Sequence, residues 1–256
     1  MSSPAAPAER YALAEGVVAL GPGLAFLPAS RALIAADAHL AYEEVVGGVL
    51  PLWSTDEIVA LLAAVARSCG AREIVFLGDI VHGPHMSDGA AARVRGALDR
   101  LRSETQVTLV AGNHEGRSRA FAVLGEMVSA AERDGWLLVH GDGQAHLGRR
   151  TIIGHLHPSL RLDARASVPA FVGGEKLIVV PALSPYSSGL DCCSGDFAAA
   201  LGAWDVRRDD VAVVAVAAGR LFPFGSLARL RALFAEPAPR RAPPGLARFR
   251  RKLGPG

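Results

Sequence analysis

The chain has two recurring patterns of hydrophobic positions: short apolar runs, and longer stretches with helical spacing. The short runs are rich in β-branched residues and end at glycine, proline or polar residues, which predicts buried β-strands. They cover residues 17–20, 24–27, 32–36, 73–77, 107–110, 136–139, 151–153, 171–172, 177–180, 203–206 and 211–217. Glycine-rich turns at residues 21–23 and 173–174 predict hairpins, and residues 203–206 and 211–217 are expected to form a third.

Helices are predicted where apolar residues recur every three or four positions. One such face consists of Ile58, Leu61, Leu62, Val65 and Cys69. Ser54 is expected to cap this helix, with Glu57 completing a capping box, and Gly70 is expected to end it. Two further helices are expected at about residues 88–102 and 119–133.

The order of the predicted elements indicates the fold class. Strands and helices alternate in the first half of the chain, which favours parallel pairing through right-handed crossovers. The second half is mostly strands, which favours antiparallel pairing. Two mixed β-sheets packed face to face, with helices outside, satisfy both requirements and define an α/β fold. We expect residues 1–10 to be disordered, 11–235 to form one domain, and 236–256 to form a Pro/Arg-rich tail.

Composition narrows the class of protein only in part. The 256 residues are 50% hydrophobic, enough for one sizeable core, and a net charge of +2 neither requires nor excludes a nucleic-acid partner. The three cysteines are too few for a disulfide framework. The N-terminus lacks the apolar run of a signal peptide, and the longest apolar stretch, 211–218, is too short to span a membrane. A cytoplasmic protein with no membrane partner is the simplest expectation.

Six of the eight histidines lie in five short motifs that follow predicted strands. The motifs are Asp37-Ala38-His39, Gly78-Asp79-Ile80-Val81-His82, Gly112-Asn113-His114-Glu115, Val139-His140-Gly141 and Gly154-His155-Leu156-His157. Each alone is common as a turn or a core histidine, but α/β folds gather ligands beyond the carboxyl ends of strands. The ordered set therefore predicts a metal site. His85 and His146 fall outside the motifs and are expected on the surface, His85 within reach of a substrate.

Two divalent cations about 3.5–4 Å apart require a bridging ligand and several terminal ones. Asp79 is the predicted bridge, because its carboxylate has two oxygens and a charge to share. The other ligands fall into two sets: Asp37, His39 and His157 for one metal, and Asn113, His140 and His155 for the other. These nitrogen and oxygen ligands suit manganese, iron or zinc, and Mn²⁺ is the ion we expect.

Three residues beside these ligands are candidates for catalysis. His114 directly follows a ligand, and as an imidazolium it is expected to stabilise or protonate the leaving oxygen, worth about 10²–10⁴ in rate. Glu115 is expected to orient His114, and His82 to contact a phosphate oxygen. The predicted nucleophile is a metal-bound hydroxide, since coordination lowers the pKa of water towards about 7.

Basic residues offer candidates for substrate binding. Arg117 and Arg119 could bind the substrate phosphate, and a solvated helix start is the alternative interpretation. From Arg229 to the end of the chain, eight Arg or Lys residues stand against one acid, Glu236. This end could lie along nucleic-acid phosphates, and a solvated linker is again the alternative.

Taken together, the five motifs resemble the pattern of the calcineurin-like metallophosphoesterase superfamily over residues 32–158. Three segments extend the resemblance to the DNA ligase-associated DNA-damage-response phosphoesterases and their archaeal relatives: Leu-Pro at 27–28, Gly-His-Leu-His-Pro at 154–158 and Pro-Ala-Leu-Ser-Pro-Tyr-Ser-Ser-Gly-Leu at 181–190. Residues 78–82 also look like a segment of the double-strand-break repair nucleases, in which this histidine assists catalysis.

The resemblance implies a metallo-dependent phosphatase fold, an αββα sandwich, and a phosphodiesterase, with a nuclease linked to DNA repair as the narrower form of that activity. It also implies a functional link to a DNA ligase or helicase. The roles assigned above agree with those in the superfamily. Ala38 replaces a bulkier or hydroxylated residue and Glu115 the usual aspartate, and neither departure removes a ligand.

Three functions compete. A phosphodiesterase acting on nucleic acid or nucleotides is favoured by the short segments between His114, His140 and His155, which leave no room for a cap domain. A phosphomonoesterase or pyrophosphatase acting on a small metabolite or nucleotide is the alternative. A non-catalytic scaffold is disfavoured, because the candidate ligands and His114 are all present.

Overall fold

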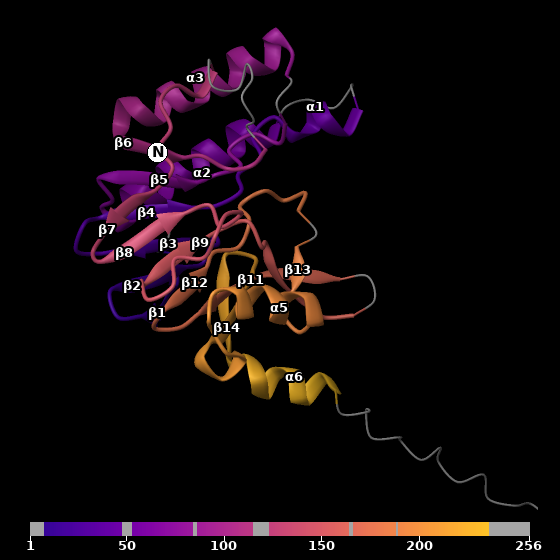
Figure 1. Cartoon of the computed structure of the whole chain (residues 1–256). Coiled ribbons are helices and arrows are strands. Elements are labelled where there is room, and N and C mark those ends of the chain that lie inside the picture. Colours follow the sequence, from indigo (N-terminus) through magenta and orange to yellow (C-terminus); the bar gives the residue numbers. More distant parts are fainter. Residues whose placement is uncertain are drawn as a thin grey trace, which may run out of the picture.

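The computed structural model describes residues 8–47, 53–83, 86–114, 123–163, 166–187 and 189–235, which form two packed β-sheets with helices on both outer sides (Figure 1). The predicted α/β class with two mixed sheets is confirmed. In the described part of the chain the helices are α1 (Tyr42–Gly47), α2 (Trp53–Cys69), α3 (Asp88–Glu104), α5 (Gly195–Ala203) and α6 (Leu227–Ala235), with a 3-10 turn η1 (Arg208–Asp210).

The first sheet has six strands within the described residues, in the order β1-β2-β3-β4-β5-β6. They are β1 (Arg10–Ala14), β2 (Val17–Leu20), β3 (Leu24–Leu27), β4 (Ala32–Ala35), β5 (Glu73–Leu77) and β6 (Gln106–Val110). β1 to β4 pair antiparallel, and β2 and β3 form the predicted hairpin. β4, β5 and β6 pair in parallel, with helices in the crossovers between them.

The second sheet has nine strands in the same described ranges, with β13-β10-β11-β12-β9-β8-β7 as its main path. Off this path, β14 pairs with β11, and β15 pairs with β14. They are β7 (Ala131–Arg133), β8 (Trp136–Val139), β9 (Thr151–Ile153), β10 (Pro158–Arg161), β11 (Ser167–Gly173), β12 (Leu177–Val179), β13 (Leu190–Asp191), β14 (Ala212–Ala217) and β15 (Arg220–Ser226). β8, β9 and β12 are parallel, and β11 and β12 form the predicted hairpin.

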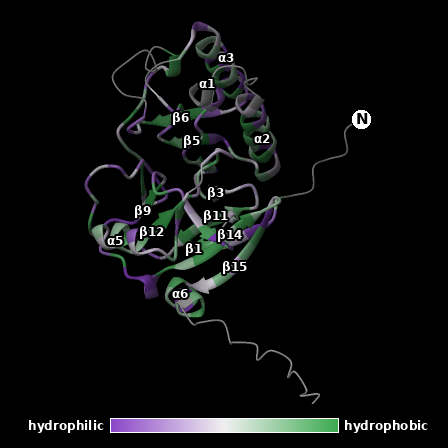
Figure 2. Ribbon diagram, turned by 90° about the vertical axis from the view of Figure 1, so that its right-hand side faces the viewer, coloured by the Kyte–Doolittle hydropathy of each residue, from purple (hydrophilic) through white to green (hydrophobic). Residues whose placement is uncertain are grey.

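Apolar side chains fill three layers of this sandwich. The layer between α2, α3 and the first sheet includes Leu62 and Leu98, and the layer between the sheets includes Trp136. The third layer, between the second sheet and α5 and α6, includes Phe197 and Leu227. Figure 2 shows the hydrophobic strands inside the molecule. The arrangement is the helix–sheet–sheet–helix order predicted from the sequence.

Strand β5 shows why the apolar runs are unbroken. All five of its residues are buried, with Ile74 and Phe76 in the layer next to the helices and Val75 and Leu77 in the layer between the sheets. A strand buried on both faces needs apolar residues at every position. Glu73 is the exception, and Arg133 on β7 compensates its charge with two hydrogen bonds of 2.7 Å. This pair ties the two sheets together.

The helix predicted over residues 119–133 is wrong for the described part of that range. Only residues 123 and 124 are helical, and Ala131–Arg133 forms β7, paired antiparallel with β8. The local composition favours a helix, but pairing with β8 and the ion pair from Arg133 to Glu73 outweigh that weak preference.

Two other local predictions are also wrong. Residues 203–206 form no strand, because Ala203 ends α5, and β14 pairs instead with β15. The turn between β14 and β15 is Ala218-Gly219, whose φ values of 49° and 73° suit a tight hairpin. The capping box is wrong because Ser54 lies inside α2, and its N–H donates to Glu43 Oε1 at 2.8 Å.

Strand β1 starts at Arg10, within the segment 1–10 that was expected to be disordered, and residues 1–7 of that segment lie outside the described residues. Glu9 also takes part in the fold, because its backbone O accepts a hydrogen bond from Gly21 N at 3.0 Å. Within the described ranges, every helix falls short of the length and apolar character that a membrane span requires.

Candidate metal centre

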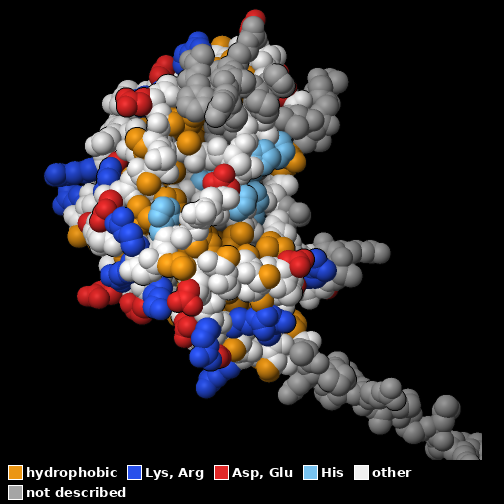
Figure 3. All heavy atoms as spheres, viewed as in Figure 1, with side chains coloured by type: hydrophobic (Ala, Val, Ile, Leu, Met, Phe, Trp, Pro, Cys, Tyr) orange, Lys and Arg blue, Asp and Glu red, His pale blue; other side chains and the backbone are white. Residues whose placement is uncertain are grey.

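The histidine-bearing motifs meet at one edge of the sandwich. Three follow the parallel strands β4, β5 and β6, and two follow β8 and β9 of the other sheet. Backbone hydrogen bonds of 3.0 Å link neighbouring motifs, from His39 N to Asp79 O and from Gly154 N to His140 O. Figure 3 shows histidine side chains gathered on one face. Segments far apart in the sequence therefore present their side chains to one place.

Two groups of side chains lie at this edge, and Asp79 belongs to both. One ligand atom from each member of the first group lies within 4.8 Å of the others: Asp37, His39, Asp79 and His157. By the same measure the second group is Asp79, His140 and His155. Asn113 lies beside the second group, with its Oδ1 2.9 Å from His140 Nε2. The grouping agrees with the two sets expected from the sequence, and metal binding itself stays a prediction.

The burial of these groups fits a bound cation. Asp37 is 0% exposed and Asp79 2%, and buried carboxylates are costly unless a positive charge compensates them. Asp37 Oδ1 has no hydrogen-bond partner among the described residues and lies 3.2 Å from His157 Nε2. An unpartnered buried oxygen beside imidazole nitrogens is what a metal ligand needs. The side chains are thus consistent with a metal site.

The backbone at this edge is conformationally unusual. Five candidate ligands have positive φ angles: Asp37 (50°), His39 (45°), Asp79 (46°), His155 (57°) and His157 (42°). Residues other than glycine rarely adopt this region, and such strain clusters at functional sites. The surrounding fold therefore holds these side chains in directions that an unconstrained chain would avoid.

Two glycines allow the close approach of the motifs. A Cβ atom on Gly154 would lie 2.7 Å from Asp37 Oδ2, and one on Gly78 would lie 2.5 Å from His140 Nδ1. Gly78 also has a φ of 76°, which favours glycine. These positions explain why glycine precedes Asp79 and His155.

Hydrogen bonds orient the imidazole rings. His140 Nδ1 donates to Leu77 O at 2.8 Å, so Nε2 faces Asp79 Oδ2 at 3.3 Å. His157 Nδ1 lies 2.5 Å from Ser187 Oγ, so its Nε2 faces Asp37. Metal-binding histidines typically have the second ring nitrogen held in this way.

The electrostatics of the site depend on burial and on the Asp79–His140 pair. Burial alone would raise the pKa of Asp79, but the hydrogen bond and charge of His140, with His114 N–H, lower it to about 2. Burial alone would lower the pKa of His140, but Asp79 and Asp37 raise it to about 9. Burial and then His157 lower the pKa of His39 to about 3. Without metal, the site at neutral pH holds an ion pair beside a neutral His39.

His114 and His82 lie at the open side of the groups. The His114 side chain is 37% exposed, and its Nδ1 lies 3.0 Å from the His82 backbone O. Its Nε2 lies 3.7 Å from Asp79 Oδ2. The His82 ring stacks on His114 at 4.7 Å, and burial, then the charge of His114, lower the pKa of His82. Both rings can therefore reach a molecule that enters from solvent.

Some predicted residues lie outside the described ranges. Glu115, Arg117, Arg119 and His85 belong to them, so their roles stay predictions. His146 is exposed, as expected.

Sequence reasoning missed three residues beside the candidate ligands. Tyr42 lies 4.5 Å from the His82 ring, and Tyr186 stacks on Tyr42 at 5.2 Å with an interplanar angle of 14°. Ser187 contacts His157. The sequence signal for Tyr186 and Ser187 is that both lie in the segment 181–190.

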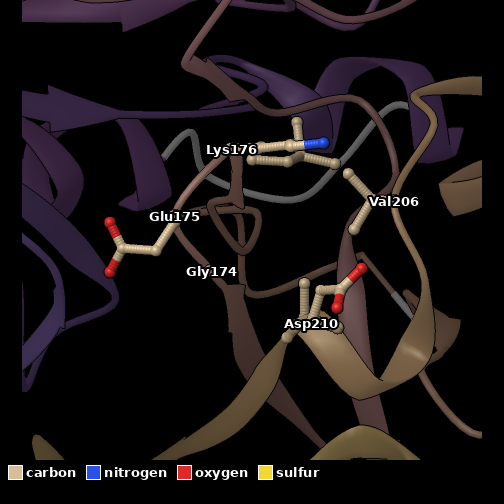
Figure 4. A pocket seen from close by; sticks show the side chains of 7 residues that line it. Gly174, Glu175, Lys176, Val206 and Asp210 are labelled. Carbon is tan, nitrogen blue, oxygen red and sulfur yellow. The ribbon is translucent and has the colours of Figure 1, made fainter.

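A cavity of about 370 Å³ lies elsewhere, between the β11–β12 turn and η1 (Figure 4). Its polar side chains are Glu175, Lys176 and Asp210, and its lining includes none of the candidate ligands. It has no histidine and no cluster of acidic groups, so the chemistry expected from the sequence belongs to the histidine-lined edge.

Comparison with protein-family models found no match, and comparison with curated proteins found none either. Among solved structures, the fold is similar to the crystal structure of Pseudomonas putida nuclease MPE. The TM-score is 0.63 and the sequence identity 22%, and the match covers 85% of this chain and 100% of that chain. At this identity, the similarity establishes the fold.

Proposed function

We propose that this protein hydrolyses phosphodiesters with the help of two divalent metal ions. The observation that carries the proposal is the position of Asp79, a buried carboxylate shared by two groups of metal-binding side chains. Phosphatases and nucleases with two-metal sites hold their ions about 3.5–4 Å apart. The fold similarity to a Pseudomonas putida nuclease supports this class of reaction. We infer membership of the calcineurin-like superfamily, in its DNA ligase-associated branch.

The proposed ligands divide the negative charge unequally. One ion is held by Asp37, His39, His157 and Asp79, and the other by Asn113, His140, His155 and Asp79. The first ion thus has two carboxylates and the second only a shared one, which leaves positive charge to attract an anionic substrate. Mn²⁺ is the ion we favour, with iron and zinc as alternatives. Bound ions would polarise the phosphate and offset the charge that develops during hydrolysis.

His114 is the proposed proton donor to the leaving oxygen. If its Nδ1–H donates to His82 O, its Nε2, which lies 3.7 Å from Asp79 Oδ2, can carry the transferred proton. The His82 ring, stacked on His114, is proposed to contact a phosphate oxygen. Glu115 is proposed to orient His114, and Arg117 and Arg119 to bind the substrate phosphate.

Nucleic acid is the substrate class we favour. In the described part of the segment between His114 and His140, the strands β7 and β8 belong to the sheet, and they form no cap over the histidines. An uncovered site can admit a polymer backbone. The name of the similar solved structure, a nuclease, supports the same class. A ligase or helicase encoded beside this protein would support a role in DNA repair.

The proposal can be tested by comparing two chromogenic esters. With Mn²⁺ bound, the protein should hydrolyse bis-p-nitrophenyl phosphate faster than p-nitrophenyl phosphate, and a chelator should abolish the activity. A strong preference for the monoester would reject the phosphodiesterase in favour of a phosphomonoesterase.

The role of His114 needs a separate experiment. His114→Ala should lower kcat by about 10²–10⁴ while the manganese content stays unchanged. His146→Ala is the matched control, because His146 is an exposed histidine outside the motifs. Full activity in His114→Ala would show that the chemistry is assigned to the wrong residue. Absence of hydrolysis of both esters by the metal-loaded wild type would favour a scaffold.

A further inference from the structure

A row of aromatic rings leads outward from the candidate metal centre. His82 stacks on His114, the Tyr42 ring lies 4.5 Å from the His82 ring, and Tyr186 stacks on Tyr42 at 5.2 Å. The row therefore begins at the proposed proton donor. Its outer member, Tyr186, is 46% exposed although one face of its ring is covered by Tyr42. A large aromatic surface next to a catalytic site thus remains open to solvent.

Tyr186 is held in place by helix α1 and by hydrogen bonds that connect its loop to the segment after β4. Its hydroxyl donates to Glu43 Oε1 at 3.4 Å, and Glu43 is 2% exposed. Its backbone N–H donates to Ser184 Oγ at 3.3 Å, and Ser184 N in turn donates to Asp37 O at 3.2 Å. The ring therefore has a fixed position relative to Asp37, and binding a planar group against it requires little further ordering.

The neighbouring residue strengthens this connection to the centre. Ser187 contacts His157 Nδ1, so one short loop both orients a candidate ligand and presents the exposed ring. A tyrosine that only packed against Tyr42 would be expected to be buried, whereas Tyr186 is 46% exposed. The open ring instead offers the surface on which a nucleic-acid base stacks, an interaction that every base can make.

We propose that Tyr186, supported by Tyr42, is the platform for a base of the substrate and makes this site prefer nucleotide diesters over diesters without a base. The inference rests on the proposed function, because it takes the phosphate to lie at the metal centre. It deepens that function by assigning a residue that selects the substrate.

The test uses two diesters with the same leaving group. One is the p-nitrophenyl ester of thymidine 5′-phosphate, and the other is methyl p-nitrophenyl phosphate, which has no base. In the manganese-loaded full-length protein, Tyr186→Ala should lower the ratio of kcat/KM for the thymidine ester to that for the methyl ester by about 5- to 100-fold. The change should appear mainly in KM for the thymidine ester.

Further variants separate stacking from structural roles. Tyr186→Phe keeps the ring and loses the hydroxyl, so it should retain the preference, whereas Tyr186→Leu fills similar space and should lose it. Phe222→Ala is the control, because Phe222 is an aromatic residue of β15 with 40% exposure. Thermal unfolding and manganese content show whether each variant remains folded and loaded.

The outcomes distinguish this inference from the proposed function. If the wild type hydrolyses both diesters and neither Tyr186→Ala nor Tyr186→Leu changes the ratio more than twofold, base stacking on Tyr186 is wrong and the diesterase stands. If the loaded wild type hydrolyses neither diester, the proposed function is wrong, and the platform is rejected with it.

Discussion

Asp79→Asn is the most informative change to this protein, because it removes one charge that both proposed ions share. Asparagine has nearly the same shape as aspartate, and it tolerates the positive φ of 46° at this position better than most residues. The fold and the hydrogen bond from His114 N to Oδ1, 3.0 Å long, should therefore survive. The substitution tests the charge and not the packing.

The expected effect follows from the unequal charges of the two groups. A carboxylate about 2 Å from a divalent ion contributes about 4 kcal/mol to the free energy of metal binding, even with full aqueous screening. This corresponds to a factor on the order of 10³ in metal affinity. The first group keeps the charge of Asp37, whereas the second keeps only neutral Asn113 and imidazoles. Asp79→Asn should thus lose the ion held by His140 and His155 and retain a weakened ion at the first group.

Calorimetric titration with Mn²⁺ and metal analysis after dialysis would measure this loss. We expect two bound ions per wild-type chain and one per variant chain. The pKa of His140, about 9 in the metal-free protein, should also fall, because its hydrogen bond with Asp79 is a main cause of the increase. Histidine NMR signals followed against pH would report this shift.

Asp142→Asn is the control, because Asp142 is an exposed acid whose charge is felt by His155 but which belongs to neither group. It should bind two ions like the wild type. If Asp79→Asn also binds two ions with affinities within tenfold of the wild type, the shared carboxylate is not what holds the pair, and the two-metal reasoning is refuted.

Three other predictions follow from local contacts. Gly154→Ala would place a Cβ 2.7 Å from Asp37 Oδ2, so it should cost about 1–3 kcal/mol of stability and weaken manganese binding; unchanged thermal unfolding would contradict this. Ser187→Ala removes the contact that orients the His157 ring, so the affinity for one manganese ion, measured by calorimetry, should fall about 10- to 100-fold. An unchanged affinity would show that Ser187 does not position this ligand. Glu73→Gln should lower the free energy of unfolding by about 1–3 kcal/mol at pH 7, because it replaces the buried carboxylate that makes charged hydrogen bonds with Arg133. Burial alone would raise the pKa of Glu73, but hydrogen bonds from Arg133 and Thr108 lower it in the folded protein. The ionised Glu73 therefore contributes fully to the free energy of unfolding above its unfolded pKa of about 4.3. That contribution is lost as the pH falls through the lower folded pKa. Urea unfolding at pH 7 and pH 3 should show the difference from wild type shrinking on acidification, and a growing difference would contradict the sign.

The sequence predicted the sheets well, because strands buried on both faces leave continuous apolar runs. The grouping around Asp79 was predictable for a related reason: parallel strands such as β4, β5 and β6 bring their carboxyl ends to one edge. Residue type then limited which groups could share a cation. The set of candidate ligands could therefore be predicted from residue type and strand order without any distances.

The failures share a different physical cause. Ala131–Arg133 forms a strand because of partners elsewhere in the chain, which outweigh its local helical preference. The Tyr42–Tyr186 stack depends on the bridge between Ala36 and Ala182, which brings the loop after β12 next to the end of β4. No local pattern of hydrophobic and polar positions carries that long-range information.

The left-handed backbone at the candidate ligands has a consequence for how the protein can evolve. Each such residue stores about 1 kcal/mol or more of conformational strain, which glycine or asparagine would relieve. Laboratory selection for heat resistance alone, with no demand for turnover, should therefore enrich glycine and asparagine at positions 39, 155 and 157. Histidine at these three positions would then be explained by the proposed metal site, to which it supplies ligands at the cost of a less stable fold.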